Sequence, residues 1–315
     1  MKRPRALPRV LGLLDVGILS SASMGPAYSL ASTMGPMVAA AGTRALAALV
    51  ALTGVMTLVA LTFARLSRRF PDAGSSYSWI ARAYGARGGG YAAWLLLLSN
   101  FFATMTTALP AAVYTLALVA PAHATDPRWD ALVGTLWIAA STALLWFGLR
   151  PTALLTALFL LVELLVLAAS ALCALAIHAP PEHFSSAALA AARPALLPGL
   201  GGIAAAMVLG IWMTDGWEVS ASASEETRGS NATAGRGGLL GLLVTAAILI
   251  GAMAAYFRVG SVTGFVANQS DALGYVAQRL GGGPWTFALD ATVLVSSGSA
   301  LWTTMLYLSR SVYAM

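Results

Sequence analysis

The segment from Gly210 to Glu218 places two carboxylates and two glycines among residues apolar enough to cross a membrane. Trp212, Asp215 and Glu218 stand three residues apart, so a helix would present them on one face. A charged side chain in hydrocarbon costs several kcal/mol, and such residues usually face a bundle interior or a water-filled path. Because Gly216 weakens the helix beside Asp215, we expect a helix that is interrupted in mid-membrane, with ionisable groups at the interruption.

A second interruption is expected near the N-terminus, at Gly25 and Pro26. Proline lacks a backbone N–H and disfavours a helical residue before it, so the helix should break near Ser23–Gly25 and restart at Pro26. The restart would leave three amides free to bind a carboxylate, those of Ala27, Tyr28 and Ser29. A simple proline kink is the alternative for this segment alone. Two such interruptions together are typical of the substrate sites of secondary transporters.

Glu163 lies near the middle of another apolar window, residues 152–177. At helical spacing it shares a stripe with small, hydroxyl and leucine side chains, namely Thr156, Leu160, Leu167, Ser170 and Ala174. That stripe should face the interior of the bundle. A glutamate at this depth is a candidate proton carrier, and a structural hydrogen bond to a neighbouring helix is the alternative.

Three further polar residues are secondary candidates. Asn100 shares a helical face with Thr104 and Thr107, which favours polar packing between helices, and Ser296 and Ser297 lie deep enough to offer hydroxyls to a cation.

Each residue of the segment Gly210–Glu218 also has a purely structural interpretation. Trp212 would more often pack against lipid or core, and Glu218 could be a buried group with its hydrogen bonds satisfied. Glu225 and Glu226 follow this helix and are expected to be solvated or paired with Arg228.

The composition excludes most classes of soluble protein. Hydrophobic residues make up 58% of the 315 residues and charged residues 10%, which is typical of a membrane protein. The net charge of +6 fits basic cytoplasmic loops better than nucleic-acid binding, since no basic stripe with interleaved aromatics is present. The single cysteine, Cys173, allows neither a disulfide framework nor a cysteine-based metal site, and nothing predicts a cofactor. His123, His178 and His183 all fall in predicted external loops, so no enzyme signature competes.

Windows of about 20 apolar residues, the length that spans a bilayer, predict about eight membrane helices. They lie near residues 10–42, 45–64, 89–119, 131–148, 152–177, 199–221, 238–257 and 284–308. Placing the N-terminus in the cytoplasm leaves few basic residues outside, only Arg44, Arg128, Arg193, Arg258 and Arg279. This follows the positive-inside rule and predicts a multi-pass protein of the cell membrane. Short helices are expected in two loops, an amphipathic one from Ser75 to Tyr84 at the cytoplasmic surface and an external one from Asp271 to Leu280.

The chain resembles the amino acid–polyamine–organocation (APC) permease superfamily. The matching stretches are the interrupted first helix, Phe70–Pro71–Asp72–Ala73–Gly74–Ser75–Ser76–Tyr77, the segment from Trp212 to Glu226, and the final Tyr307–Met315. They occur in the family's order and cover essentially the whole chain. The resemblance implies an all-α leucine-transporter-type fold, in which two inverted five-helix repeats surround a substrate at unwound helices 1 and 6.

Carried onto this chain, the resemblance also implies roles for individual residues. Ser23, Met24 and Gly25 would meet a substrate carboxylate through backbone amides, and Met213, Thr214 and Asp215 would meet its ammonium through carbonyls beside Gly216. Trp212 would be a gating aromatic and Glu218 a proton-sensitive group. The implied domains are a cytoplasmic tail (1–9), a first repeat (10–178), an external loop (179–198) and an incomplete second repeat of helices 6–8 (199–315).

The chain departs from the family at three points. Some relatives couple protons through a lysine in helix 5, but the sole lysine here is Lys2, and Glu163 is the candidate replacement. Asp215 is unusual at its position and favours a cationic substrate, such as a diamine or a basic amino acid. Relatives have ten core helices or more, whereas this sequence ends at helix 8, so a fragment or a C-terminal truncation is expected.

Two functions remain open from the sequence. The first is a secondary carrier for amino acids or related amines, coupled to protons or to a cation such as sodium, that alternates access around helices 1 and 6. The second is a non-transporting, truncated paralogue that serves as a membrane sensor or subunit.

Overall fold

The structure is a computed structural model that describes residues 8–124, 126–177 and 199–315. Its described residues form helices, with one isolated backbone bridge between Leu11 and Thr227. In this described part, seven segments are long and apolar enough to cross a membrane. The chain is therefore an all-helical, multi-pass membrane protein, as predicted.

The first of the seven segments, Leu13–Arg69, joins two of the windows expected from the sequence, 10–42 and 45–64. It contains α1 (Leu13–Met24), α2 (Pro26–Ala41), the short η1 (Gly42–Arg44) and α3 (Ala45–Arg69). The backbone leaves helical geometry at Gly25, whose φ of 53° is left-handed and easy for a residue without a Cβ. Pro26 then opens α2 at a position where its missing N–H costs no hydrogen bond.

The next helices complete the first half of the chain. They are α4 (Ser76–Val119), η2 (Pro121–His123), α5 (Pro127–Trp146) and α6 (Leu149–Ala176). The amphipathic helix expected from Ser75 to Tyr84 forms the start of α4. It continues into the long membrane helix across Gly85, whose φ of 73° marks a kink. The predicted short helix is thus one arm of a bent helix rather than a separate element.

The second half begins with α8 (Gly199–Thr214), α9 (Val219–Ser222) and η5 (Ser224–Glu226). It continues with α10 (Thr233–Val259), α11 (Val262–Ala267), α12 (Ala272–Arg279) and α13 (Pro284–Ala314). The external helix expected from Asp271 to Leu280 is α12, which Asp271 caps by accepting a hydrogen bond from the Gly274 amide.

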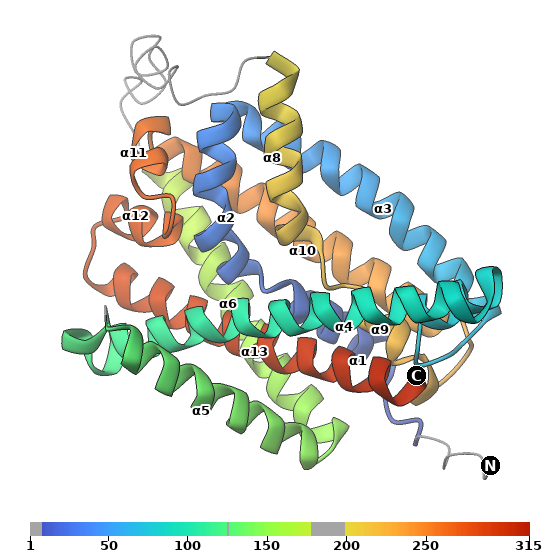
Figure 1. Ribbon diagram of the computed structural model, residues 1–315. Helices are drawn as coiled ribbons and strands as arrows, with labels where there is room; N and C mark the ends of the chain where they lie inside the picture. Colours follow the sequence, from blue (N-terminus) through green and yellow to red (C-terminus); the bar gives the residue numbers. More distant parts are fainter. Residues whose placement is uncertain (1–7, 125, 178–198) are drawn as a thin grey trace.

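Helix α13 is central to the packing. It runs beside α4 and also packs on α5, α6, α1 and α2 (Figure 1). Its most apolar window is 72% buried, the largest share among the seven membrane segments. Helix α1 packs on α10 and α2 packs on α8, so the joint at Gly25 lies inside the bundle. Figure 1 also shows α11 and α12 at the opposite end of the molecule from the C-terminus.

Some predictions fall on residues outside the described ranges. They are most of the predicted tail (1–9), the predicted loop (179–198), and His178 and His183. His123 belongs to η2 and stacks near Trp129, with ring centroids 4.8 Å apart.

Candidate functional site

The joint between α1 and α2 lies against the chain that follows α8. Helix α8 ends at Thr214, and Gly216 has a φ of 104° before α9 begins at Val219. The Ser20 hydroxyl donates to the Trp217 carbonyl at 3.0 Å. A Cβ added to Gly216 would come within 2.9 Å of the Ser23 carbonyl oxygen. The two helix interruptions are therefore in contact, and their close approach requires glycine at position 216.

A cavity of about 100 Å³ opens at this point, between α1, the start of α2, α4, α13, the end of α8 and the turn that follows α8. Seven of the candidate site residues line it: Ser23, Met24, Asn100, Trp212, Asp215, Gly216 and Glu218. Asp215 is exposed, whereas Glu218 is partly buried and accepts a hydrogen bond from the Gly216 amide at 3.0 Å. The cavity is large enough for a small molecule, and its walls combine carboxylates, hydroxyls and aromatic rings.

Trp212, Asp215 and Glu218 share the cavity for a reason that differs from the helical spacing seen in the sequence. Because α8 ends at Thr214, only Trp212 of the three belongs to that helix. The turn through Gly216 brings the other two back to the same space. The helical spacing thus predicted that the three residues share one space, although the backbone does not follow that periodicity.

Two aromatic side chains form one wall of the cavity. Trp212 is 37% exposed and meets Tyr28 edge to face, with ring centroids 6.3 Å apart. The Tyr28 hydroxyl donates to the Thr106 carbonyl at 2.9 Å, which fixes the ring between α2 and α4. An apolar part of a ligand would pack against these rings.

Four of the named residues lie close to the cavity without lining it. Met213 and Thr214 are fully buried, Met213 in the apolar core and Thr214 with its hydroxyl directed to carbonyls of α8. Gly25 is the joint itself, and Ser297 donates to the Val293 carbonyl of its own helix.

Glu163 is fully buried behind the joint and joins three helices. Its Oε1 accepts a hydrogen bond from the Ala27 amide at 2.6 Å and another from the Ser296 hydroxyl. Its Oε2 is buried and has no hydrogen-bond partner among the described residues. Ser296 in turn accepts from the Tyr28 amide at 3.1 Å. Glu163 thus ties α6 to the start of α2 and to the middle of α13.

The whole stripe around Glu163 faces inward, as predicted from its spacing. Thr156, Leu160, Leu167, Ser170 and Ala174 are all buried. Trp302 of α13 donates to Thr156 at 2.8 Å, and Ser170 bonds Tyr256 of α10 at 2.7 Å. The polar members of the stripe are therefore paired with other helices, which stabilises them in a membrane.

The amides at the start of α2 are not free, so that expectation is wrong. The Ala27 amide bonds Glu163, the Tyr28 amide bonds Ser296, and the Ser29 amide bonds the Gly25 carbonyl at 2.7 Å. The sequence predicted where the helix restarts. It did not reveal that Glu163, far along the chain, would accept a hydrogen bond from the first free amide of that helix.

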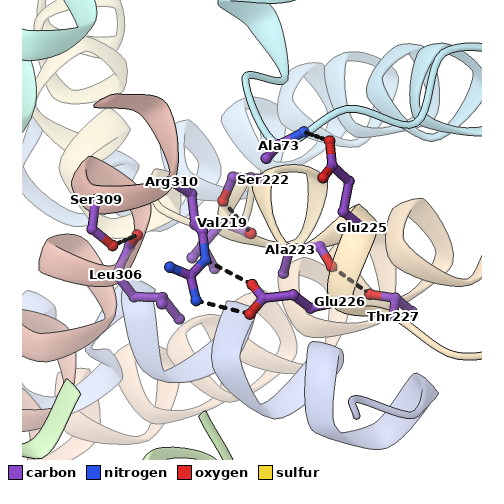
Figure 2. Close-up of polar contacts among 10 residues, drawn as sticks. All are labelled: Ala73, Val219, Ser222, Ala223, Glu225, Glu226, Thr227, Leu306, Ser309 and Arg310. Carbon is purple, nitrogen blue, oxygen red and sulfur yellow. Dashed lines mark hydrogen bonds and ion pairs between the residues drawn. The ribbon is translucent and has the colours of Figure 1, made fainter. Parts of the chain in front are cut away.

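A second polar cluster lies beyond α9, away from the cavity (Figure 2). Glu226 makes two hydrogen bonds to the Arg310 guanidinium, at 2.7 and 2.8 Å, and Glu225 accepts from the Ala73 amide at 3.1 Å. The expectation of a solvated or Arg228-paired side chain is wrong for Glu226, which is only 3% exposed, and Arg228 instead donates to the Arg9 carbonyl. Glu225 is half-buried. The partner was not visible from the sequence because it lies on α13, far along the chain.

The structure adds cavity residues that the sequence analysis did not single out as site residues. They include Ser99, Thr304 and Tyr307, together with the side chains of Tyr28 and Thr107, which the sequence suggested only for a backbone amide and for helix packing. Tyr28 and Tyr307 are polar aromatics inside apolar helices, a signal that could have placed them at a site. Within the described residues, no group of three or more His, Cys, Asp or Glu side chains could hold a metal ion.

Comparison with known proteins agrees with this architecture. A family model described as amino acid permease matches residues 11–315, which is nearly the whole chain. A search of curated proteins found no match. Membership of a permease family indicates a transporter rather than an enzyme, with an amino acid substrate and a membrane location. The chain belongs to the amino acid permease family.

Proposed function

We propose that this protein is a secondary active transporter that carries an amino acid or a related amine across the cell membrane. The observation that carries the proposal is the cavity at the place where α1 and α8 both end, lined by Trp212, Asp215 and Glu218. Helix ends inside a membrane protein present polar backbone groups that continuous helices hide, and transporters use them to bind substrates.

In the proposed architecture, α1–α2 and α8–α9 are the interrupted first and sixth helices of two inverted five-helix repeats. The packing of α1 on both α8 and α9 supports this arrangement. Movement of the two interrupted helices relative to α4 and α13 would open the cavity to one side of the membrane and then to the other. The N-terminus would lie in the cytoplasm, as the distribution of basic residues favours.

Glu163 is the proposed coupling group. It is buried among α2, α6 and α13, and its Oε2 lacks a partner among the described residues, so a proton on this oxygen would remove an unpaired charge. Protonation would also weaken the bond from the Ala27 amide to the carboxylate, because bonds to a charged acceptor are stronger than bonds to a neutral one. Glu163 would thereby link a proton to the position of α2. Glu218, which lines the cavity, is the second candidate.

Uptake by the purified full-length gene product in proteoliposomes tests the proposal. A panel of radiolabelled amino acids and amines, with and without an imposed proton or sodium gradient, should reveal saturable uptake that one gradient drives. Trp212→Ala should reduce uptake, because the residue lines the cavity. Binding without transport under every gradient would instead favour a membrane sensor or subunit.

A further inference from the structure

A second, larger cavity opens between the end of α5, the start of α6 and the C-terminal part of α13. Its volume is about 910 Å³, within the range of about 300–1,000 Å³ that is typical of pockets for small organic ligands. Figure 2 shows four of its lining residues, Glu226, Leu306, Ser309 and Arg310. The two cavities share no described lining residue, so the proposed substrate site does not account for this space.

Apolar side chains form most of the walls of the larger cavity. They include Leu145, Phe147, Leu149, Met305, Leu308 and Val312. Trp146 and Phe147, at the end of α5, are 88% and 78% exposed. Exposed aromatic side chains at the end of a membrane helix are typical of the boundary between hydrocarbon and water. The cavity therefore lies at the depth where the acyl chains of a lipid meet its headgroup.

One positive charge in this cavity is not neutralised by the protein. Arg150 lines the cavity, is exposed, and makes no ion pair or side-chain hydrogen bond with another described residue. Glu226, the acidic residue among the described lining residues, is neutralised by its two hydrogen bonds with Arg310. Asp15 and Arg228, which share a smaller hollow with Arg150, carry opposite charges. The guanidinium of Arg150 is thus available to an anion.

The start of α6 adds backbone donors beside that guanidinium. Helix α6 begins at Leu149 in the wall of the cavity and runs for 28 residues, with no side-chain cap and no acidic residue in its first turn. The first amides of a helix lack partners within it and lie at the positive end of its dipole. Pro151 has no N–H, so the amides of Leu149 and Arg150 remain. A phosphate would meet these amides and the guanidinium, which suits phosphate oxygens geometrically.

From the apolar walls and the unpaired cation, we propose that this cavity binds an anionic phospholipid. The phosphate binds Arg150 and the start of α6, and an acyl chain lies along the apolar walls between α5 and α13. Net charge decides the lipid class, because the ammonium of a zwitterionic headgroup neutralises its own phosphate and is repelled by Arg150. Basic pockets between membrane helices on the cytoplasmic side are typical sites for anionic lipids.

The lipid site is separate from the proposed transport function. In the proposed orientation the start of α6 lies on the cytoplasmic side, so the leaflet in which the lipid lies depends on that orientation. The binding itself does not, because it follows from the walls and the charge of the cavity.

Lipid titration of the purified full-length gene product tests the inference. Native mass spectrometry in detergent counts the bound lipids and gives their affinities. Dioleoyl phosphatidylglycerol and dioleoyl phosphatidylcholine have the same acyl chains and a phosphate each, but differ in net charge. One molecule of phosphatidylglycerol should bind about fivefold or more tightly than phosphatidylcholine. Glycerol 3-phosphate, which has no acyl chain, should not compete.

Two variants at Arg150 test the role of the charge. Arg150→Gln should reduce the preference for phosphatidylglycerol to less than about twofold, whereas Arg150→Lys keeps the positive charge and should retain most of it. Because Arg150 is exposed and has no partner among the described residues, both variants should fold like the parent. Arg87→Gln is the matched control, since Arg87 is exposed on α4 and lines neither cavity.

A variant in the wall tests whether the lipid lies in the cavity. Thr142 of α5 lines the cavity and is exposed, so Thr142→Trp adds a ring to the wall without disturbing the core. It should weaken the binding of both lipids, because the ring takes space from the acyl chain.

Each outcome decides the inference. Binding that prefers phosphatidylglycerol, and that depends on Arg150 and on the space beside Thr142, supports it. Equal affinities for the two lipids, a preference that survives Arg150→Gln, or binding that Thr142→Trp leaves unchanged would overturn it. Competition by glycerol 3-phosphate as strong as that by the lipid would identify a site for soluble phosphate esters instead. The uptake assay is a separate measurement, so the proposed transport function does not depend on these results.

Discussion

Glu163 is a single side chain on which the coupling proposal depends. It holds the start of α2 through the Ala27 amide and α13 through Ser296. Glu163→Gln keeps the size and an acceptor oxygen but cannot exchange a proton. If Glu163 couples protons, uptake by the parent should rise as the external pH falls, because protons then drive transport inward. Uptake by the Gln variant should not depend on pH.

The pH dependence should be measured as initial uptake rates in proteoliposomes at a fixed internal pH. Asp126→Asn serves as the control for the loss of a carboxylate outside the cavity. An unchanged pH profile in Glu163→Gln and also in Glu218→Gln would rule out proton coupling through these two residues.

Gly216 sets the distance between the two interruptions. Its φ of 104° and its approach to the Ser23 carbonyl leave no room for a Cβ. Gly216→Ala should lower the free energy of unfolding by about 1–3 kcal/mol, the usual cost of such a strained backbone, and should weaken ligand binding. Thermal unfolding in detergent measures the loss.

Gly251→Ala is the matched control for Gly216→Ala. Gly251 lies inside α10, and a Cβ there would have no neighbour within 4 Å. Alanine should therefore keep or raise stability at this position. Equal unfolding temperatures for the two variants would contradict the close packing of α1 against the chain after α8.

At the scale of elements, the pair of Glu226 and Arg310 joins η5 to the end of α13 (Figure 2). Glu226→Gln leaves the partly buried guanidinium without its charged partner and should lower the free energy of unfolding by about 1–3 kcal/mol. The double variant with Arg310→Gln should recover part of the loss, because no unpaired charge remains. A double-mutant cycle of thermal unfolding measures the coupling, and strictly additive losses would show that the pair contributes little.

The elements near the site show what sequence reasoning captures. The proline rule located the joint at Gly25–Pro26, and helical spacing identified the inward stripe around Glu163, because both depend on local chemistry. The partners of Glu163 and Glu226 come from segments more than 80 residues away, so only the folded chain reveals them. The start of α2 is the clearest case, because its backbone amides were expected to be free and are hydrogen-bonded in the structure.

At the scale of the whole molecule, the proposed orientation makes a labelling prediction. In a Cys173→Ser background, a single cysteine at Ser270, between α11 and α12, should react with an impermeant thiol reagent added to intact cells. One at Ser230, in the loop before α10, should react only after the membrane is opened. Both positions are exposed, so burial does not explain a difference. The reverse pattern would place the N-terminus outside.

The location of the substrate site is best tested by protection of a cavity residue. Ser99 is exposed and lines the cavity, so a single cysteine at this position in the Cys173→Ser background reports access to it. Ligands that compete in the uptake assay should slow thiol labelling of Ser99→Cys and leave Ser270→Cys unchanged. Ligand binding that saturates without any protection of Ser99→Cys would contradict the assignment of the cavity between α1, α4, α8 and α13 as the substrate site.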